Sequence, residues 1–119
     1  MSKTTTEILK NLQSSTGLTP NVLARLSVGL SLRDSNIPEM KPKDTAGQEI
    51  NRNTLTGEYD YIYRALITQH TGREVKDEEY FPELFQAHLE RGASLLNREY
   101  RKAGNRERFF TQLLLLSEE

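Results

Sequence analysis

Positive charge is concentrated near the end of this 119-residue chain. The formal net charge of the whole chain is -1, so any attraction to a polyanion such as DNA must come from a local cluster of cations. Residues 98 to 108 hold the densest such cluster, opposed only by Glu99 and Glu107. Its members are Arg98, Arg101, Lys102, Arg106 and Arg108. Contact with phosphates is one interpretation, and a solvated helix face with intrahelical ion pairs is the other; the residues alone leave both open.

A second, weaker candidate for phosphate contact is the pair Lys41 and Lys43. These lysines lie in residues 33 to 48, which contain prolines and a glycine and follow no helical or strand period, so a surface loop is predicted. Glu39 and Asp44 stand beside them. A solvated loop is therefore favoured, and a loop that touches phosphate is the alternative.

Arg52 lies in residues 47 to 60, a stretch too polar for an ordinary core strand. Its planar guanidinium can pair with carboxylates such as Glu49, Glu58 or Asp60 and tie helices together, or it can face a phosphate. We favour the structural role, because three acidic neighbours repel a phosphate as strongly as one arginine attracts it. The predicted structural motif comprises Glu49, Asn51, Arg52, Thr54, Gly57 and Glu58.

Catalytic chemistry has few candidate residues here. The chain has no cysteine, so it cannot form disulfides, bind zinc through thiolates or carry a persulfide. The carboxylates at 49, 58 and 77 to 79 could in principle hold a metal for nuclease chemistry, but capping and helix-dipole effects explain them. No G-x-x-x-x-G-K phosphate loop occurs, and His88 on an apolar stripe predicts a core histidine bonded to a polar partner. We expect a non-catalytic protein without catalytic residue, metal or cofactor.

Helical periodicity dominates the elements that must position these residues. Apolar spacing predicts a first helix over about residues 5 to 15, and Thr19 followed by Pro20 predicts the start of a second. The two resemble the helix pair of ribbon-helix-helix proteins, although scarcely any chain precedes them to form the DNA-reading strand. Residues 49 to 55 are predicted to form at most a short strand.

Three further helices are predicted. Thr56 is expected to cap a helix that ends at Gly72 and carries an apolar stripe. Asp77 is expected to cap a helix of about 20 residues, in which Gly92 indicates a close crossing by another helix. Asn105 is expected to cap a terminal helix. Together these elements predict a mainly α fold, a compact bundle of about five helices forming one domain over residues 1–119.

Several separate motifs, in the same order along about residues 8 to 98, resemble the DndE family of DNA sulfur modification (phosphorothioation) proteins. They are Thr16-Gly17-Leu18-Thr19-Pro20-Asn21-Val22-Leu23, Leu30-Ser31-Leu32, Ile37-Pro38, Gly47-Gln48-Glu49-Ile50-Asn51-Arg52, Thr54-Leu55-Thr56-Gly57-Glu58-Tyr59-Asp60 and Ala87-His88-Leu89-Glu90-Arg91-Gly92. The number and order of these motifs make the resemblance more specific than any one of them.

The resemblance implies a DNA-binding, self-associating accessory protein of the machinery that replaces a non-bridging phosphate oxygen of DNA with sulfur, and not the sulfur-transfer enzyme. Its implied partners are double-stranded DNA, nicked or intact, other subunits of that machinery, and further copies of the chain in a dimer or tetramer. This favours phosphate contact for the basic run at 98 to 108.

Two alternatives stay open. One is an adaptor that assembles the sulfur-transfer and ATPase-like subunits without touching DNA, and the other is a ribbon-helix-helix-like transcriptional regulator. A cytoplasmic protein without a membrane segment is expected, because no apolar run approaches the roughly 20 residues of a membrane span and no signal peptide is visible.

Overall fold

The fold is built from helices wrapped around one long helix, α5. The computed structural model describes residues 1–39 and 51–117, and in these residues it contains six α-helices and no strand. The elements are α1 (Lys3–Thr16), α2 (Pro20–Arg33), α3 (Arg52–Leu55), the 3-10 turn η1 (Gly57–Tyr59), α4 (Asp60–Thr71), the irregular turn η2 (Glu79–Leu84), α5 (Phe85–Ala103) and α6 (Arg106–Ser117). The predicted mainly α fold is confirmed. No helix in the described part of the chain is both long and apolar enough to cross a membrane.

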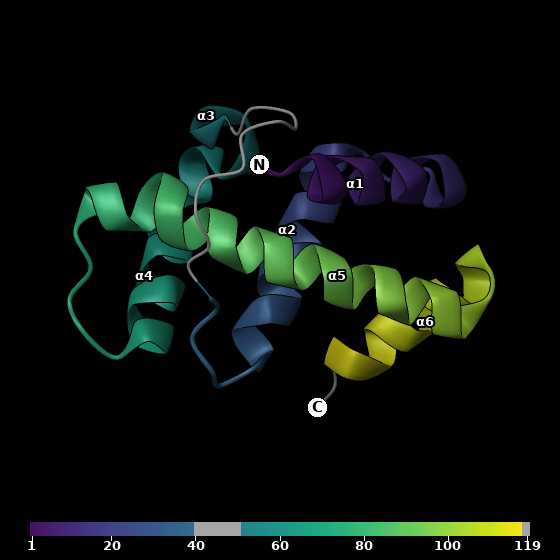
Figure 1. Ribbon diagram of the computed structural model, residues 1–119. Helices are drawn as coiled ribbons and strands as arrows, with labels where there is room; N and C mark the ends of the chain where they lie inside the picture. The colour runs from purple at the N-terminus through teal and green to yellow at the C-terminus, as the bar shows by residue number, and fades with distance from the viewer. Residues whose placement is uncertain (40–50, 118–119) are drawn as a thin grey trace.

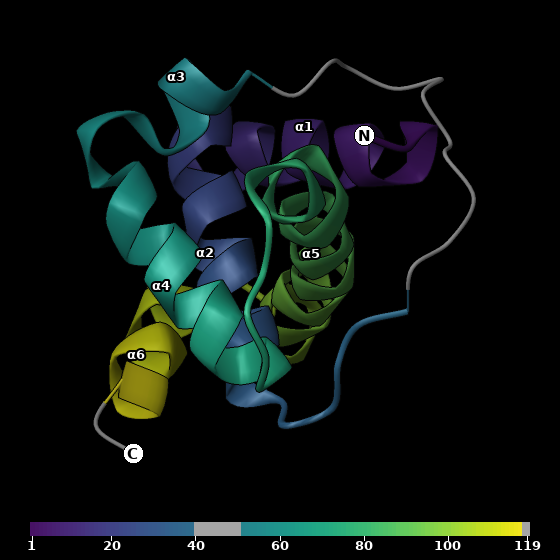
Figure 2. The same ribbon diagram turned by 90° about the vertical axis from the view of Figure 1, so that its left-hand side faces the viewer.

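The centre of the fold is the crossing of α2 over α5. Figure 1 shows α5 running across the molecule with α2 passing beside it, and Figure 2 looks roughly along α5 with α1, α2 and α4 around it. At the crossing, a Cβ added to Gly92 would lie 1.6 Å from the backbone oxygen of Ser27. Only a glycine permits this approach, so the close crossing predicted at Gly92 is confirmed.

The ends of α1 and α2 are fixed by local chemistry. The Ser2 hydroxyl accepts the backbone N–H of Thr5 at 3.1 Å, while the Ser2 N–H donates to Glu90 Oε1 of α5 at 2.7 Å. Thr19 caps α2 as predicted, accepting the N–H of Val22 at 3.4 Å. The two helices pack on α5, and their side chains Leu9, Leu12, Leu23 and Val28 are buried in the core.

At most a short strand was predicted near residues 49 to 55, and the residues that the structure describes there form none. Residues 52 to 55 form the helical turn α3, because the Asn51 side chain accepts the N–H of Thr54 at 3.1 Å and so caps a helix. Arg25 of α2 closes the other end, donating to the carbonyl oxygens of Leu55 at 2.7 Å and Thr54 at 3.2 Å. Glu49 and the residue after it lie outside the described residues.

Only part of the apolar stripe of α4 faces the core, because Ile67 is buried and Tyr63 packs against the core while other members of the stripe are exposed. Of the residues in α4 only Ile67 is buried. Tyr59, Ile62 and Leu66 are 57%, 40% and 43% exposed. Thr56 does not cap this helix with its side chain; its hydroxyl donates instead to the carbonyl oxygen of Arg52 and to the Asp60 carboxylate.

Asp77 does not cap the next helix as predicted. Its carboxylate instead accepts hydrogen bonds from two arginines, Arg52 and Arg64. The turn before α5 begins instead with the N–H groups of Glu79 and Tyr80 both bonded to one backbone carbonyl. Backbone hydrogen bonds therefore form the first turn in place of a capping side chain. The Asp77 carboxylate instead bonds the two arginines.

Candidate nucleic-acid interface

The basic run lies at a corner of the molecule where α5 ends and α6 begins. Gly104 adopts a left-handed conformation with φ of 82°, and its N–H donates to the Tyr100 carbonyl at 3.0 Å, which ends α5. Asn105 then caps α6, as predicted, by accepting the N–H of Arg108 at 2.9 Å. The chain reverses here within two residues, as Figure 1 shows at its right-hand side.

The inner side of this corner is well packed. Ala103 and Phe109 are buried, and the Tyr100 and Phe109 rings meet edge to face with centroids 5.3 Å apart. Such aromatic pairs hold two helices at a defined angle. The cations of the corner therefore stand on a rigid support.

The outer side of the corner is cationic. All five predicted residues are exposed, and we call them the basic corner: Arg98, Arg101, Lys102, Arg106 and Arg108. The one ion pair found within it, among the described residues, joins Lys102 Nζ to Glu99 Oε1 at 3.9 Å, on the exposed surface. The intrahelical pairing that the alternative interpretation required is thus limited to one long contact.

Helix dipoles explain only part of this charge. Arg101 and Lys102 occupy the last turn of α5, where cations are favoured. Arg106 and Arg108 occupy the first turn of α6, where cations are disfavoured and only Glu107 offsets them. The positions of Arg106 and Arg108 therefore have no explanation in helix stability.

The second predicted pair, Lys41 and Lys43, lies outside the described residues. Among its described neighbours, Glu39 lines a surface groove of about 520 Å³ beside the start of α1. Arg98 lines the same groove from α5, together with Arg91 and Glu90. The basic corner thus adjoins a groove that contains carboxylates as well as cations.

Arg52 lies at the centre of an ion-pair network on the far side of the fold. Its guanidinium donates to both oxygens of Asp60, at 3.0 and 2.6 Å, and to both oxygens of Asp77, at 2.9 and 2.8 Å. It also stacks over the Tyr80 ring, 5.1 Å from its centroid. Pairing with Asp60 was among the sequence-based expectations, whereas the contact with Asp77 was not foreseen. Glu58 is exposed and takes no part in the bonds around Arg52.

The network fixes the charge state of its members. The hydrogen bond from Arg52, with those from Thr56 and Tyr80, lowers the pKa of Asp60 from 3.8 to about 2, against the opposing effect of partial burial. Burial and the bond to Asp60 raise the pKa of the Tyr80 hydroxyl. Bonds to Asp77 and Asp60 raise the pKa of Arg52. All donors of Arg52 in these bonds are directed at carboxylates, which leaves its guanidinium little capacity for a phosphate.

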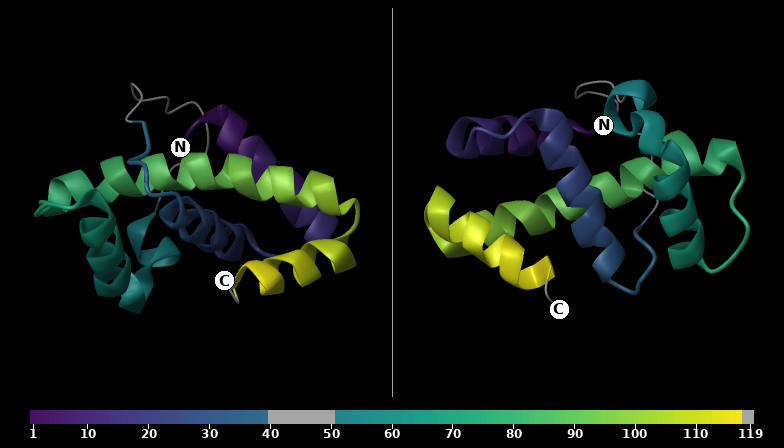
Figure 3. Two further views of the ribbon diagram at one scale, coloured as in Figure 1. Left: turned by 90° about the horizontal axis from the view of Figure 1, so that it is seen from below. Right: turned by 180° about the vertical axis from the view of Figure 1, so that it is seen from behind.

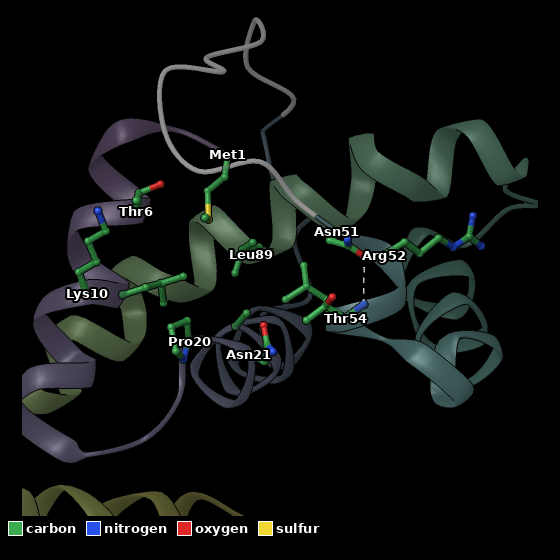
Figure 4. A pocket seen from close by; sticks show the side chains of 12 residues that line it. Met1, Thr6, Lys10, Pro20, Asn21, Asn51, Arg52, Thr54 and Leu89 are labelled. Atoms are coloured by element: carbon green, nitrogen blue, oxygen red, sulfur yellow. Dashed lines mark hydrogen bonds between the residues drawn. The ribbon is translucent and has the colours of Figure 1, made fainter.

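A cavity of about 670 Å³ lies beside this network, between α1, α2, α3 and α5. Figure 4 shows Lys10 and Asn21 on its walls, while the Arg52 side chain extends away from it. The guanidinium therefore belongs to the ion-pair network and not to this cavity.

The predicted core histidine is confirmed. His88 is fully buried, and its Nδ1 lies 2.9 Å from the Ser31 hydroxyl, which also accepts a bond from Arg91 Nε at 2.8 Å. Burial, then the charges of His70 and Arg91, lower the pKa of His88 to about 4, so the ring is neutral near pH 7. In the described part of the chain no three His, Asp or Glu side chains are grouped so as to hold a metal ion.

Comparisons with known proteins agree with one another. A family model described as "DNA sulphur modification protein DndE" matches residues 1–103. A crystal structure of DndE from Escherichia coli B7A, described as involved in DNA phosphorothioation modification, is similar with a TM-score of 0.66 and 26% identity, over 81% of this chain and 92% of that chain. No curated protein matches the chain.

Proposed function

Since the chain belongs to the DndE family of DNA sulfur modification proteins, we propose that it is a non-catalytic, DNA-binding accessory subunit of a DNA phosphorothioation complex. In this proposal the basic corner contacts the DNA backbone and reads no base edges. Phosphate contacts position a protein on DNA without conferring sequence preference, so binding is expected to be largely independent of sequence.

One observation carries the proposal: the basic corner is exposed, rigidly supported and almost unpaired among the described residues. Arg106 and Arg108 add cations at a helix start where they oppose the dipole. A protein with a net charge of -1 can hold a polyanion only where positive charge is local. The corner supplies that charge on a surface that folding alone does not explain.

The proposal is tested by removing three charges from the corner. Arg101, Lys102 and Arg106 replaced together by Gln should weaken binding to every DNA sequence alike. Each phosphate contact contributes about 0.9 to the slope of log affinity against log salt, so loss of three contacts should flatten that slope by about 2.7. Titration of a labelled duplex at several salt concentrations measures both effects, and the melting temperature should change little.

A matched control removes the same charge elsewhere. Lys3, Lys10 and Lys76 are exposed and lie outside the corner, so their combined replacement by Gln lowers the net charge equally. This control should keep most of the affinity and the salt slope. Equal losses in the two triple variants would show a general charge effect, and unchanged binding by the corner variant would make Lys41 and Lys43 the next candidates.

Self-association is part of the proposal. Its motive is an exposed apolar face made by Tyr59 of η1 with Ile62 and Leu66 of α4, which an isolated chain leaves in water. We expect a dimer or tetramer, in which several basic corners act on one duplex. Light scattering at micromolar concentration gives the mass, and a monomer throughout would contradict this part.

The competing function is an adaptor that joins the sulfur-transfer and ATPase-like subunits without touching DNA. Salt-dependent binding of the purified chain to bare duplex, nicked or intact, separates the two functions. An adaptor would bind the other subunits and show no such DNA binding.

A further inference from the structure

A shallow apolar groove runs along the outer face of α2. Figure 3 (right) shows α2 lying between α4 and α6, and the groove of about 360 Å³ has Tyr63 of α4 on one side and Leu113 of α6 on the other. Its floor is formed by Val22, Leu26 and Leu30 together with Gly29. A floor of one helix between two flanking helices has the shape that receives a further helix.

Gly29 is the feature of this groove that the chain itself does not explain. A glycine inside a helix is destabilising relative to alanine. At Gly92 the close crossing with Ser27 accounts for it, but a Cβ added at Gly29 would meet nothing within 4 Å. Gly29 is exposed at the floor of the groove, where the lack of a side chain would let the backbone of another molecule approach closely.

The positive charge at the groove indicates that the molecule bound there carries acidic residues. Arg25 and Arg33 line the groove one turn before and one turn after Gly29, and no carboxylate lines it. The described contacts of the Arg25 guanidinium are with the backbone oxygens of Leu55 and Thr54, so no described carboxylate offsets its charge. The groove therefore combines an apolar floor with positive edges.

A second copy of α2 laid antiparallel across Gly29 would bring its own arginines against these edges, and like charges repel strongly where water is partly excluded. DNA is a poor fit, because its phosphates could contact the arginines at the edges but not the apolar floor between them. We propose that the groove binds an amphipathic helix of a different protein, with apolar residues at i, i+3 or i+4 and i+7 on one face and acidic residues beside them. This inference goes beyond DNA binding and uses no residue of the basic corner.

Photo-crosslinking in cells that express a complete phosphorothioation system tests the inference. A benzophenone amino acid is placed at Val22, which is 36% exposed in the groove, or at Tyr61 of α4, which is 70% exposed and does not line it. Val22 should give a product with a different protein, and mass spectrometry should find the joined segment to be an amphipathic helix with acidic flanks. A product that joins two copies of this chain, a product with nucleic acid, or no more product than at Tyr61 would overturn it.

A variant within the groove separates docking from folding. Gly29→Leu places a side chain on the floor, and its Cβ meets no atom of the chain within 4 Å, so the melting temperature and DNA affinity should not fall. The yield of the Val22 product should fall at least tenfold, and Gly29→Ala should lower it less. An unchanged yield with Gly29→Leu overturns the groove assignment, whereas loss of DNA binding by the basic-corner variants bears only on the proposed function.

Discussion

Replacing Asp60 by Asn should destabilise the protein in a pH-dependent way. The substitution keeps the size of the side chain and one carbonyl oxygen but removes the charge that Arg52 holds at 2.6 Å. In the folded state the pKa of Asp60 lies at about 2, against an ordinary value of 3.8. Because one pKa unit corresponds to ~1.36 kcal/mol, ionised Asp60 contributes about 2 kcal/mol to the free energy of unfolding.

The sign follows from the direction of the pKa change. A folded-state pKa below the unfolded one gives stability that is fully present above pH 3.8 and is lost as the pH falls toward about 2. Asp60→Asn lacks this contribution at every pH. The parent should therefore exceed the variant by about 2 kcal/mol at pH 7, and the difference should shrink below pH 4.

Urea unfolding followed by circular dichroism at pH 7, 5, 3.5 and 2.5 measures this difference. Glu58→Gln is the control, because this exposed carboxylate lies in the same segment and outside the bonds around Arg52. It should alter stability little at any of these pH values. A gap between the parent and Asp60→Asn that stayed constant from pH 7 to 2.5 would refute the assignment of the stabilisation to the Arg52–Asp60 pair.

Three further outcomes are expected. Arg52→Ala should lower the melting temperature more than Asp60→Asn, since it leaves Asp60 without its cation and Asp77 with only the longer contact to Arg64. Unchanged melting with lost DNA affinity would instead make Arg52 a ligand-binding residue. Gly92→Ala should cost about 3 kcal/mol or prevent folding, as seen in urea unfolding, because its methyl group would overlap a backbone oxygen of α2. Gly29→Ala should raise stability by up to ~1 kcal/mol in the same measurement, and a loss would show that its surroundings are not open.

Local signals in the sequence predicted the ends of several helices. Thr19, Asn105 and Gly72 act within a few residues of their own positions, so their roles can be derived without the rest of the fold. Asn51 could have been identified in the same way, but Ile50, Thr54 and Leu55 around it favoured a short strand. In the structure the Asn51 side chain accepts the N–H of Thr54, and this capping bond starts a helical turn where a strand was considered.

The orientation of α4 could not be derived from its period. Helical spacing shows that Tyr59, Ile62 and Leu66 share a face, but it does not tell whether that face meets the core or the outside. In the structure Ile67 is buried and Tyr63 packs half-buried against the core, next to the Phe85 ring. The exposed stripe became visible only when the packing of the other helices was known.

Contacts between residues far apart in the chain likewise could not be predicted from the sequence. Asp77 is 25 residues from Arg52, and Ser31 is 57 residues from His88, so no spacing rule joins them. The density of cations in the basic corner, by contrast, is a property of the sequence itself. That these side chains all point outward is a property of the corner made by Gly104, and it required the structure.

The contact at Gly92 gives α5 a single axial position against α2. A shift of α5 by one turn in either direction would bring His88 or Leu96 to the place where the Ser27 oxygen now lies, and neither fits. Sliding of the two helices is thereby blocked, and α5 behaves as a strut of about 28 Å. A force applied at one end of this strut would move the whole protein as a rigid body instead of being absorbed by slippage between helices.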